Sequence, residues 1–239
     1  FAGVGANEVS NADLGGASIV MIATAVDFPF FSLYADKKYK SVQDLGGQII
    51  GITSPGSSTD ATAQFFLQHF GMTGKVTIAP AGGTQPGILA AMTSGQMAGG
   101  ILSPPTTELA AKAGFVELVN GVSLGVPLNT NGTAVTRQYA KDHVDTVKAF
   151  LKAYQHAWTF NADPANQAVV VKTLAKYTKS DDQKVLPGYQ AMLKVWQASK
   201  TPAVNPEAVA NVLKLSPNPK ARAADPNQFV DNSLLQAVQ

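Results

Sequence analysis

Short apolar runs alternate with helix-like segments through the first half of the chain, and this alternation is the strongest constraint on its fold. Glycine and proline mark most of the joints. The β-branched run Ser18–Val26 predicts a buried strand. Repeated strand–helix–strand order predicts an α/β sheet with crossover helices. The same patterns predict strands at 1–5, 30–34, 48–53, 76–79, 99–102 and 115–119, and helices at 8–13, 41–45, 61–70, 85–94 and 106–113.

The second half has a different pattern, because apolar residues recur with helical spacing from Gln138 onward. Val147, Leu151 and Trp158 belong to one such stripe. Asp163 followed by Pro164 is typical of a helix start. Further helices are expected over 164–177, around 189–196, from 205 and over 229–238, with a proline-containing loop at 216–227.

Composition excludes several kinds of chemistry. The 239 residues contain no cysteine, which excludes disulfides, thiolate nucleophiles, iron–sulfur clusters and cysteine zinc sites. Lys and Arg number 18 against 16 Asp and Glu, with no extended basic run, so no nucleic-acid partner is expected. The best apolar run, 17–26, is half of the roughly 20 residues that a membrane helix needs. We expect no cofactor and no metal.

The most informative segment is Ile49–Asp60, with the sequence IIGITSPGSSTD. It predicts a strand, a turn rich in glycine and serine, and a helix start. Such a turn directs backbone N–H groups and hydroxyls to one point, and the helix N-terminus adds about half a positive charge. This chemistry suits a carboxylate, sulfonate or phosphate. The simpler alternative is that a serine only caps the helix. The candidate ligand-binding residues are Ser54, Gly56, Ser57, Ser58 and Thr59.

Further polar turns follow other strands, and ligands of open α/β sheets gather at the carboxyl ends of strands. Ordinary loop or core packing is the alternative for each of them. No catalytic constellation is recognisable, because the three histidines fall in predicted helices and no GxSxG motif occurs. The additional candidate ligand-binding residues are Asn7, Phe28, Gly83, Thr84, Ser103 and Pro104.

Several segments resemble the type II periplasmic solute-binding proteins of ABC importers. They are SVQDLGGQIIGITSPGSSTDATAQFFLQHFGM, GILAAMTSGQMAGGILSPPTTELAAKAGF, NTNGTAVTRQYAKDHVDTVKAFLKAY and FVDNSLL. The resemblance is to the branch that binds sulfonates, taurine, nitrate and thiamine precursors. It implies a two-lobe, periplasmic-binding-protein-like α/β fold with a helical C-terminal part. It also implies lobe one at 1–45 and 127–239, lobe two at 46–126, and a ligand in a cleft that closes by a hinge motion.

The resemblance further implies an N-terminally shortened fold. Two βα units, about 50–60 residues, usually precede the element that residues 1–5 match. Either the chain is a processed or incomplete product, or it is a genuine short form. A short form would need cover for an exposed sheet edge, and a homodimer would supply it.

The leading hypothesis is a non-enzymatic, extracytoplasmic binding protein that delivers a small organic anion or small heterocycle to an ABC permease. One alternative is a truncated sensory or scaffold module that dimerises. Another is an enzyme like the thiamine-pyrimidine synthases, but the resemblance places a Cys-rich iron motif there, and this chain has no cysteine. The candidate turns contain no arginine, so a bidentate clamp is not expected; Arg137 follows the return strand and either reaches the cleft or lies on the surface.

Overall fold

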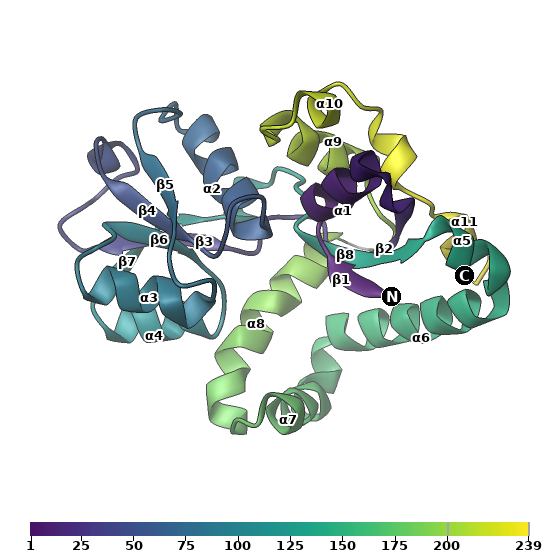
Figure 1. The fold of residues 1–239 in the computed structure, drawn as a ribbon. Helices are drawn as coiled ribbons and strands as arrows, with labels where there is room; N and C mark the ends of the chain where they lie inside the picture. The colour runs from purple at the N-terminus through teal and green to yellow at the C-terminus, as the bar shows by residue number, and fades with distance from the viewer. Residues whose placement is uncertain (200, 239) are drawn as a thin grey trace. The chain divides into compact units, whose positions relative to one another are not determined.

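The chain folds into two compact units. The computed structural model describes residues 1–199 and 201–238. Unit 1 comprises Phe1–Phe28 and Val126–Gln239, and unit 2 comprises Pro29–Gly125. The chain therefore leaves unit 1 once, builds unit 2 from one continuous segment, and returns (Figure 1).

Unit 2 is built on a five-stranded mixed sheet in the order β5-β4-β6-β3-β7. The middle strand of the parallel part, β4 (Ile49–Ile52), pairs with β5 (Thr77–Pro80) and β6 (Gly99–Leu102). The antiparallel part consists of β3 (Ser32–Asp36), which pairs with β6 and with β7 (Phe115–Asn120).

Three helices cover this sheet. One face carries α2 (Ser58–His69), and the other carries α3 (Gln85–Thr93) and α4 (Thr106–Lys112) (Figure 1). Each helix follows a parallel strand, as expected of crossover connections. Single 3₁₀ turns occur at Gln43–Leu45 and Val122–Leu124. The first of these agrees with the predicted one-turn helix at 41–45.

Two adjacent glycines allow α3 to approach the sheet closely. A Cβ atom at Gly100 would lie 2.3 Å from Cγ2 of Ile88 on α3, and one at Gly99 would lie 2.5 Å from the Tyr34 carbonyl oxygen. Real Cβ atoms do not tolerate such distances. The glycines of β6 therefore fix both the helix–sheet distance and the contact between β6 and β3.

Unit 1 contains a three-stranded antiparallel sheet and most of the helices. The sheet order is β1 (Ala2–Val4), β8 (Asn131–Thr136), β2 (Ile19–Val26). A π-helical turn at Asp13–Ala17 joins α1 to β2. The helices are α1 (Ala6–Ala12), α5 (Arg137–Asp142), α6 (Val144–Ala162), α7 (Gln167–Thr178), α8 (Asp182–Ser199), α9 (Pro206–Leu215), α10 (Pro219–Arg222) and α11 (Ser233–Gln236), with 3₁₀ turns at Pro164–Asn166 and Pro226–Phe229.

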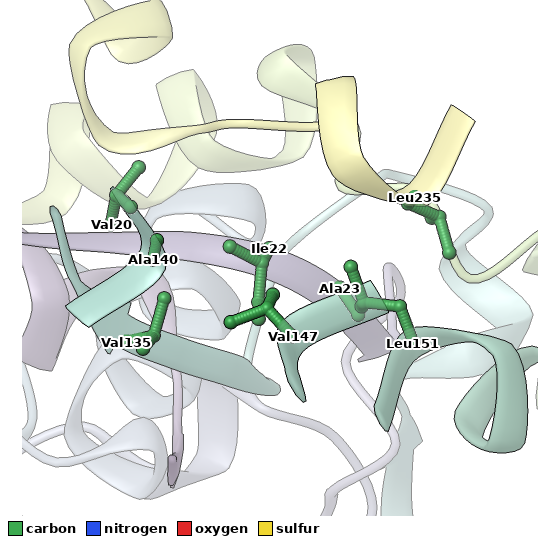
Figure 2. Close-up of a cluster of buried hydrophobic side chains, with 8 residues drawn as sticks. All are labelled: Val20, Ile22, Ala23, Val135, Ala140, Val147, Leu151 and Leu235. Atoms are coloured by element: carbon green, nitrogen blue, oxygen red, sulfur yellow. The ribbon is translucent and has the colours of Figure 1, made fainter. Parts of the chain in front are cut away.

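The core of unit 1 lies between its sheet and α6. Val147 and Leu151 of α6 are fully buried, and Figure 2 shows them against side chains of β2 and β8. This confirms that the helical stripe predicted from the sequence faces a core. The whole cluster is Val20, Ile22, Ala23, Val135, Ala140, Val147, Leu151 and Leu235.

Three expectations differ from the structure. The segment 216–227 is not only a loop, because Asn218 accepts the Lys220 N–H and α10 starts at Pro219. The last helix is shorter than 229–238, since Phe229 ends a 3₁₀ turn and α11 starts at Ser233. The segment 29–45 lies in unit 2 rather than with lobe one, because β3 pairs with β6 and β7.

Among the described residues, no helix is both long enough and apolar enough to cross a membrane.

Truncation of the core should be costly. We expect Leu151→Ala to lower the free energy of unfolding by about 2–5 kcal/mol, because it leaves a cavity beside β2. The matched control is Leu109→Ala, since Leu109 is 51% exposed on α4 and its truncation should cost well under 1 kcal/mol. Urea unfolding of both variants gives the comparison. Equal losses would contradict this description of the core.

Candidate functional site

Three polar turns meet at one edge of the unit 2 sheet. They follow β4, β5 and β6, which are parallel neighbours. Ile52 pairs with Pro80 at the strand ends, and the Ala81 N–H donates to the Ile52 carbonyl at 2.8 Å. The carboxyl ends of these strands therefore place the predicted residues of all three turns at the same edge.

The first turn contains a closed triangle of hydroxyl groups. Oγ1 of Thr53 lies 3.1 Å from Oγ of Ser57 and 2.8 Å from Oγ1 of Thr59, and the last two are 2.9 Å apart. The Thr53 N–H also donates to Thr59 Oγ1 at 2.9 Å. These contacts hold the turn after β4 against the start of α2.

The start of α2 is already capped and carries a carboxylate. Ser57 Oγ accepts the Asp60 N–H at 3.3 Å, which confirms the capping alternative for this serine. The Asp60 carboxylate is buried, and its Oδ2 accepts the Gly56 N–H at 2.7 Å. Because this negative charge lies at the positive end of the helix, it offsets part of the attraction that the helix N-terminus would offer to an anion.

The second and third turns are joined to each other. Thr84 caps α3 by accepting the Gly87 N–H at 3.1 Å, after two glycines, Gly82 and Gly83, with φ values of 71° and 70°. The Ser103 N–H donates to Oε1 of Gln85 at 2.9 Å. Gly83 and Thr84 are exposed, and Pro104 is half-buried, so both turns present atoms at the surface of unit 2.

The remaining predicted residues, Asn7 and Phe28, belong to unit 1. Asn7 is buried in the first turn of α1, where its carbonyl oxygen accepts the Ser10 hydroxyl at 3.0 Å. Phe28 is half-buried and is the last residue before the chain enters unit 2. Their roles in ligand binding stay predictions.

Sequence reasoning missed a buried polar cluster in unit 1, formed by Thr24, Asp27 and Asn129. Nδ2 of Asn129 donates to Oγ1 of Thr24 at 3.0 Å and to Oδ1 of Asp27 at 3.4 Å. The exposed fractions of the three residues are 0%, 5% and 1%. Oδ1 of Asn129 has no hydrogen-bond partner in the described part of the chain. A buried acceptor without a hydrogen bond lowers the free energy of unfolding by about 1–3 kcal/mol, so the Oδ1 atom of Asn129 is unfavourable for stability.

Burial also perturbs two ionisable groups here. Burial raises the pKa of Asp27 from 3.8 to about 6, and hydrogen bonds from Asn129, Thr24 and the Asn205 backbone oppose the rise. Burial and the nearby charge of Asp27 raise the pKa of Tyr154 to about 12. Within the described residues, no lysine, arginine or histidine forms an ion pair with Asp27. Its charge is therefore held by neutral groups alone.

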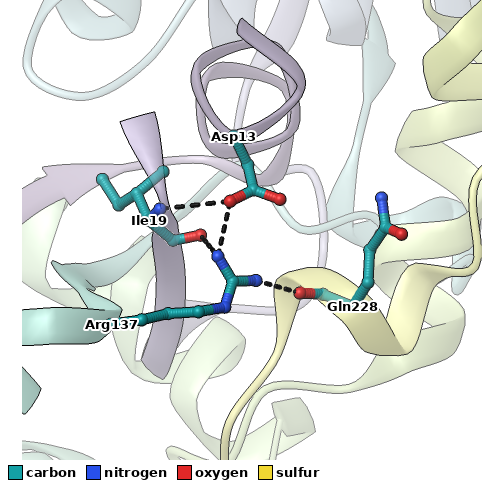
Figure 3. A network of polar contacts seen from close by, with 4 residues as sticks. All are labelled: Asp13, Ile19, Arg137 and Gln228. Atoms are coloured by element: carbon teal, nitrogen blue, oxygen red, sulfur yellow. Dashed lines mark hydrogen bonds and ion pairs between the residues drawn. The ribbon is translucent and has the colours of Figure 1, made fainter. Parts of the chain in front are cut away.

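Both arginines of the chain are engaged in structural contacts. Figure 3 shows the Arg137 guanidinium contacting the Asp13 carboxylate and the carbonyl oxygens of Ile19 and Gln228. Arg222 donates to the carbonyl oxygens of Ser216 and Pro217 at 2.7 and 3.0 Å. Arg137 therefore connects the π-helical turn after α1, β2 and the 3₁₀ turn at Pro226–Phe229 within unit 1.

The described residues contain no group of three or more His, Asp or Glu side chains placed to hold a metal ion. A cavity of about 260 Å³ in unit 2 lies at the amino ends of β4 and β6, where Tyr39 donates to Gln48 at 3.0 Å. It is thus at the sheet edge opposite the three turns.

Comparisons with known proteins agree with the fold. A family model described as NMT1/THI5 like matches residues 1–168. The structure is similar to the periplasmic nitrate-binding protein NrtA from Synechocystis, with a TM-score of 0.78, 11% identity, and 98% of this chain and 72% of that chain covered. No curated protein matches the chain by sequence.

Two sulfonate-binding proteins are also similar. The periplasmic aliphatic sulphonate-binding protein SsuA from Escherichia coli has a TM-score of 0.73 and 18% identity, with 98% of this chain and 80% of that chain covered. The alkanesulfonate-binding protein SsuA from Xanthomonas axonopodis pv. citri, bound to MOPS, has a TM-score of 0.71 and 18% identity, with 99% and 78% covered. The chain thus has the two-lobe α/β fold of periplasmic solute-binding proteins.

Removal of the Ser57 hydroxyl should destabilise the protein. Ser57→Ala loses the cap of α2 and two edges of the hydroxyl triangle, and we expect a loss of about 1–2 kcal/mol in the free energy of unfolding. Ser57→Thr keeps the hydroxyl and should recover most of that loss. If the alanine and threonine variants unfold at the same urea concentration, the cap is not important.

Stability should depend on pH through Asp27. Since burial raises the pKa of this carboxyl to about 6, the folded protein holds a proton that the unfolded chain has lost between about pH 4 and pH 6. The free energy of unfolding should therefore fall as the pH rises through this window, by up to about 3 kcal/mol from this group. Asp27→Asn should remove that contribution. Identical pH profiles of urea unfolding for both proteins would contradict it.

Proposed function

The chain belongs to the NMT1/THI5-like family, and from this premise we propose that it is the substrate-binding component of an ABC importer. The fold supports the proposal, because the nitrate-binding and sulfonate-binding proteins share it. In this role the protein captures a small molecule outside the cytoplasm and presents it to a membrane permease. No catalytic step is proposed for it.

The observation that carries the proposal is the convergence of the turns after β4, β5 and β6. Each turn precedes a helix, so N–H groups, hydroxyls and helix N-termini are gathered at one sheet edge. We propose Ser54, Gly56, Ser57, Ser58, Thr59, Gly83, Thr84, Ser103 and Pro104 as the ligand-binding residues of unit 2, and Asn7 and Phe28 as those of unit 1.

The proposed ligand is a small organic anion or a small heterocycle. Both arginine side chains donate hydrogen bonds to backbone carbonyl oxygens elsewhere, so no guanidinium at the turns is available to bind an anion through two hydrogen bonds. At the turns of unit 2, hydrogen bonds from neutral groups then determine recognition. Such recognition suits a weakly charged or aromatic ligand as well as a sulfonate or carboxylate.

Titration calorimetry with a ligand panel tests the proposal. The panel contains nitrate, ethanesulfonate, taurine, MOPS, propionate, β-alanine, methylpyrimidine and aminopyrimidine. We expect saturable heat from at least one compound, with one site per chain. A protein that is folded by circular dichroism and gives no saturable heat with the whole panel would contradict the proposed function.

Variants of two helix-capping threonines distinguish an effect on ligand binding from an effect on stability. Thr84 and Thr136 cap α3 and α5 in the same way, with N–H to Oγ1 distances of 3.1 and 3.2 Å. Thr84→Ala and Thr136→Ala should each lower the free energy of unfolding by about 1 kcal/mol. Only Thr84→Ala should weaken ligand binding, by roughly five- to tenfold for one neutral hydrogen bond. Equal affinities of the two variants would exclude Thr84 from the site.

A further inference from the structure

The cluster of Thr24, Asp27 and Asn129 has more hydrogen-bond acceptors than donors. The Asn129 amide uses both of its protons, on Thr24 and on Asp27. The Thr24 hydroxyl has one proton, and the Asn131 carbonyl lies 3.2 Å from it. An ionised carboxylate donates nothing. Since Nδ2 of Asn129 must face these two acceptors, the orientation of the amide is fixed, and its Oδ1 points to a place where the described residues supply no donor.

The carboxylate is also incompletely satisfied. Asp27 accepts from Asn129 and from the Asn205 N–H, and it shares the single Thr24 hydroxyl proton with the Asn131 carbonyl, against about four acceptor positions on a carboxylate. An ionisable group that interacts with its charge is Tyr154 of α6, which is partly buried. Within the described residues no cation pairs with Asp27, and a buried charge without a counter-ion is unfavourable.

The cluster lies where strands of the unit 1 sheet end, beside the start of α1. Asp27 follows the carboxyl end of β2, next to Phe28, and Asn129 lies two residues before the first residue of β8. The Ala6 N–H, at the first position of α1, donates to the Asn129 carbonyl at 3.4 Å, so the cluster adjoins the turn that contains Asn7.

We propose that Asp27 and Asn129 form a subsite for a hydrogen-bond-donating nitrogen of the ligand, an ammonium, an amidinium or an amino group on a heterocycle. Such a group supplies the donors that Asn129 Oδ1 and the Asp27 carboxylate lack, and a cationic group also supplies the counter-charge. The inference rests on the proposed function and narrows its ligand class to compounds bearing an N–H donor. The elevated pKa of Asp27 agrees with a carboxylate that lacks its partner in the free protein.

Matched pairs of compounds test the subsite. Calorimetry compares taurine with ethanesulfonate, β-alanine with propionate, and aminopyrimidine with methylpyrimidine at about neutral pH. In the pair that binds, the amino compound should bind roughly 10- to 100-fold more tightly, as expected for hydrogen bonds to a charged group. Asp27→Asn should remove most of this preference.

Two further variants make the result specific. Asp163→Asn changes the net charge of unit 1 by the same amount at a surface cap, where Asp163 accepts the Ala165 N–H at 2.9 Å, and it should leave the preference unchanged. Asn129→Leu removes the unpartnered oxygen and should weaken binding of the amino compound. Thermal melting checks that each variant is folded before its affinity is measured.

The possible outcomes separate the subsite from the function. If the compounds without an amino group bind as tightly as their partners, the subsite is wrong and the binding function stands. If the preference survives in Asp27→Asn, the amino group is held elsewhere and a buried water satisfies Asn129, which also overturns the subsite. If no compound of any pair binds, the proposed function fails and the subsite fails with it.

Discussion

Parallel pairing of β4 with β5 on one side and β6 on the other determines the position of the three turns that we propose as the ligand-binding residues of unit 2. It brings three strand-to-helix turns to one sheet edge, and close approach of α3 at the glycines of β6 keeps the connecting helices against the sheet. The hydroxyl triangle of Thr53, Ser57 and Thr59 then fixes the first turn internally. If a ligand binds at this edge as we propose, donors that are already oriented by such contacts reduce the entropy lost on binding.

Unit 1 is built from two separate segments of the chain, which leaves the unit after Phe28 and returns to it at Val126. The Leu128 N–H donates to the Asp27 carbonyl at 2.7 Å, so the outgoing and returning segments are joined by backbone as well as by side chains. The same place holds a buried carboxylate and an unpartnered amide oxygen. Partly satisfied polar groups destabilise a fold unless something completes them, which is why we assign this cluster to the ligand and not to stability.

Local features of the fold could be predicted from the sequence because their causes are local. The limits of β6 at 99–102 follow from its apolar run, Asp163 caps the turn that Pro164 begins, and Gly71 takes the positive φ of 67° expected after α2. The membership of β3 in unit 2 was not predictable, because it depends on pairing with strands more than 60 residues further along the chain. The Asp27–Asn129 contact spans 102 residues and involves no motif. For the strand-end turns, sequence reasoning located the residues but not Asp60, whose carboxylate changes the charge at α2.

The central proposal is that the buried Asp27 carboxylate accepts a hydrogen bond from a nitrogen of the ligand. Carboxyl-carbon NMR titration of Asp27 tests it directly, in the free protein and in protein saturated with the tightest-binding amino compound. We expect a pKa near 6 for Asp27 in the free protein and a lower pKa when the ligand is bound, because a donating or cationic nitrogen stabilises the ionised form. An Asp27 pKa that is the same with and without ligand would contradict the account.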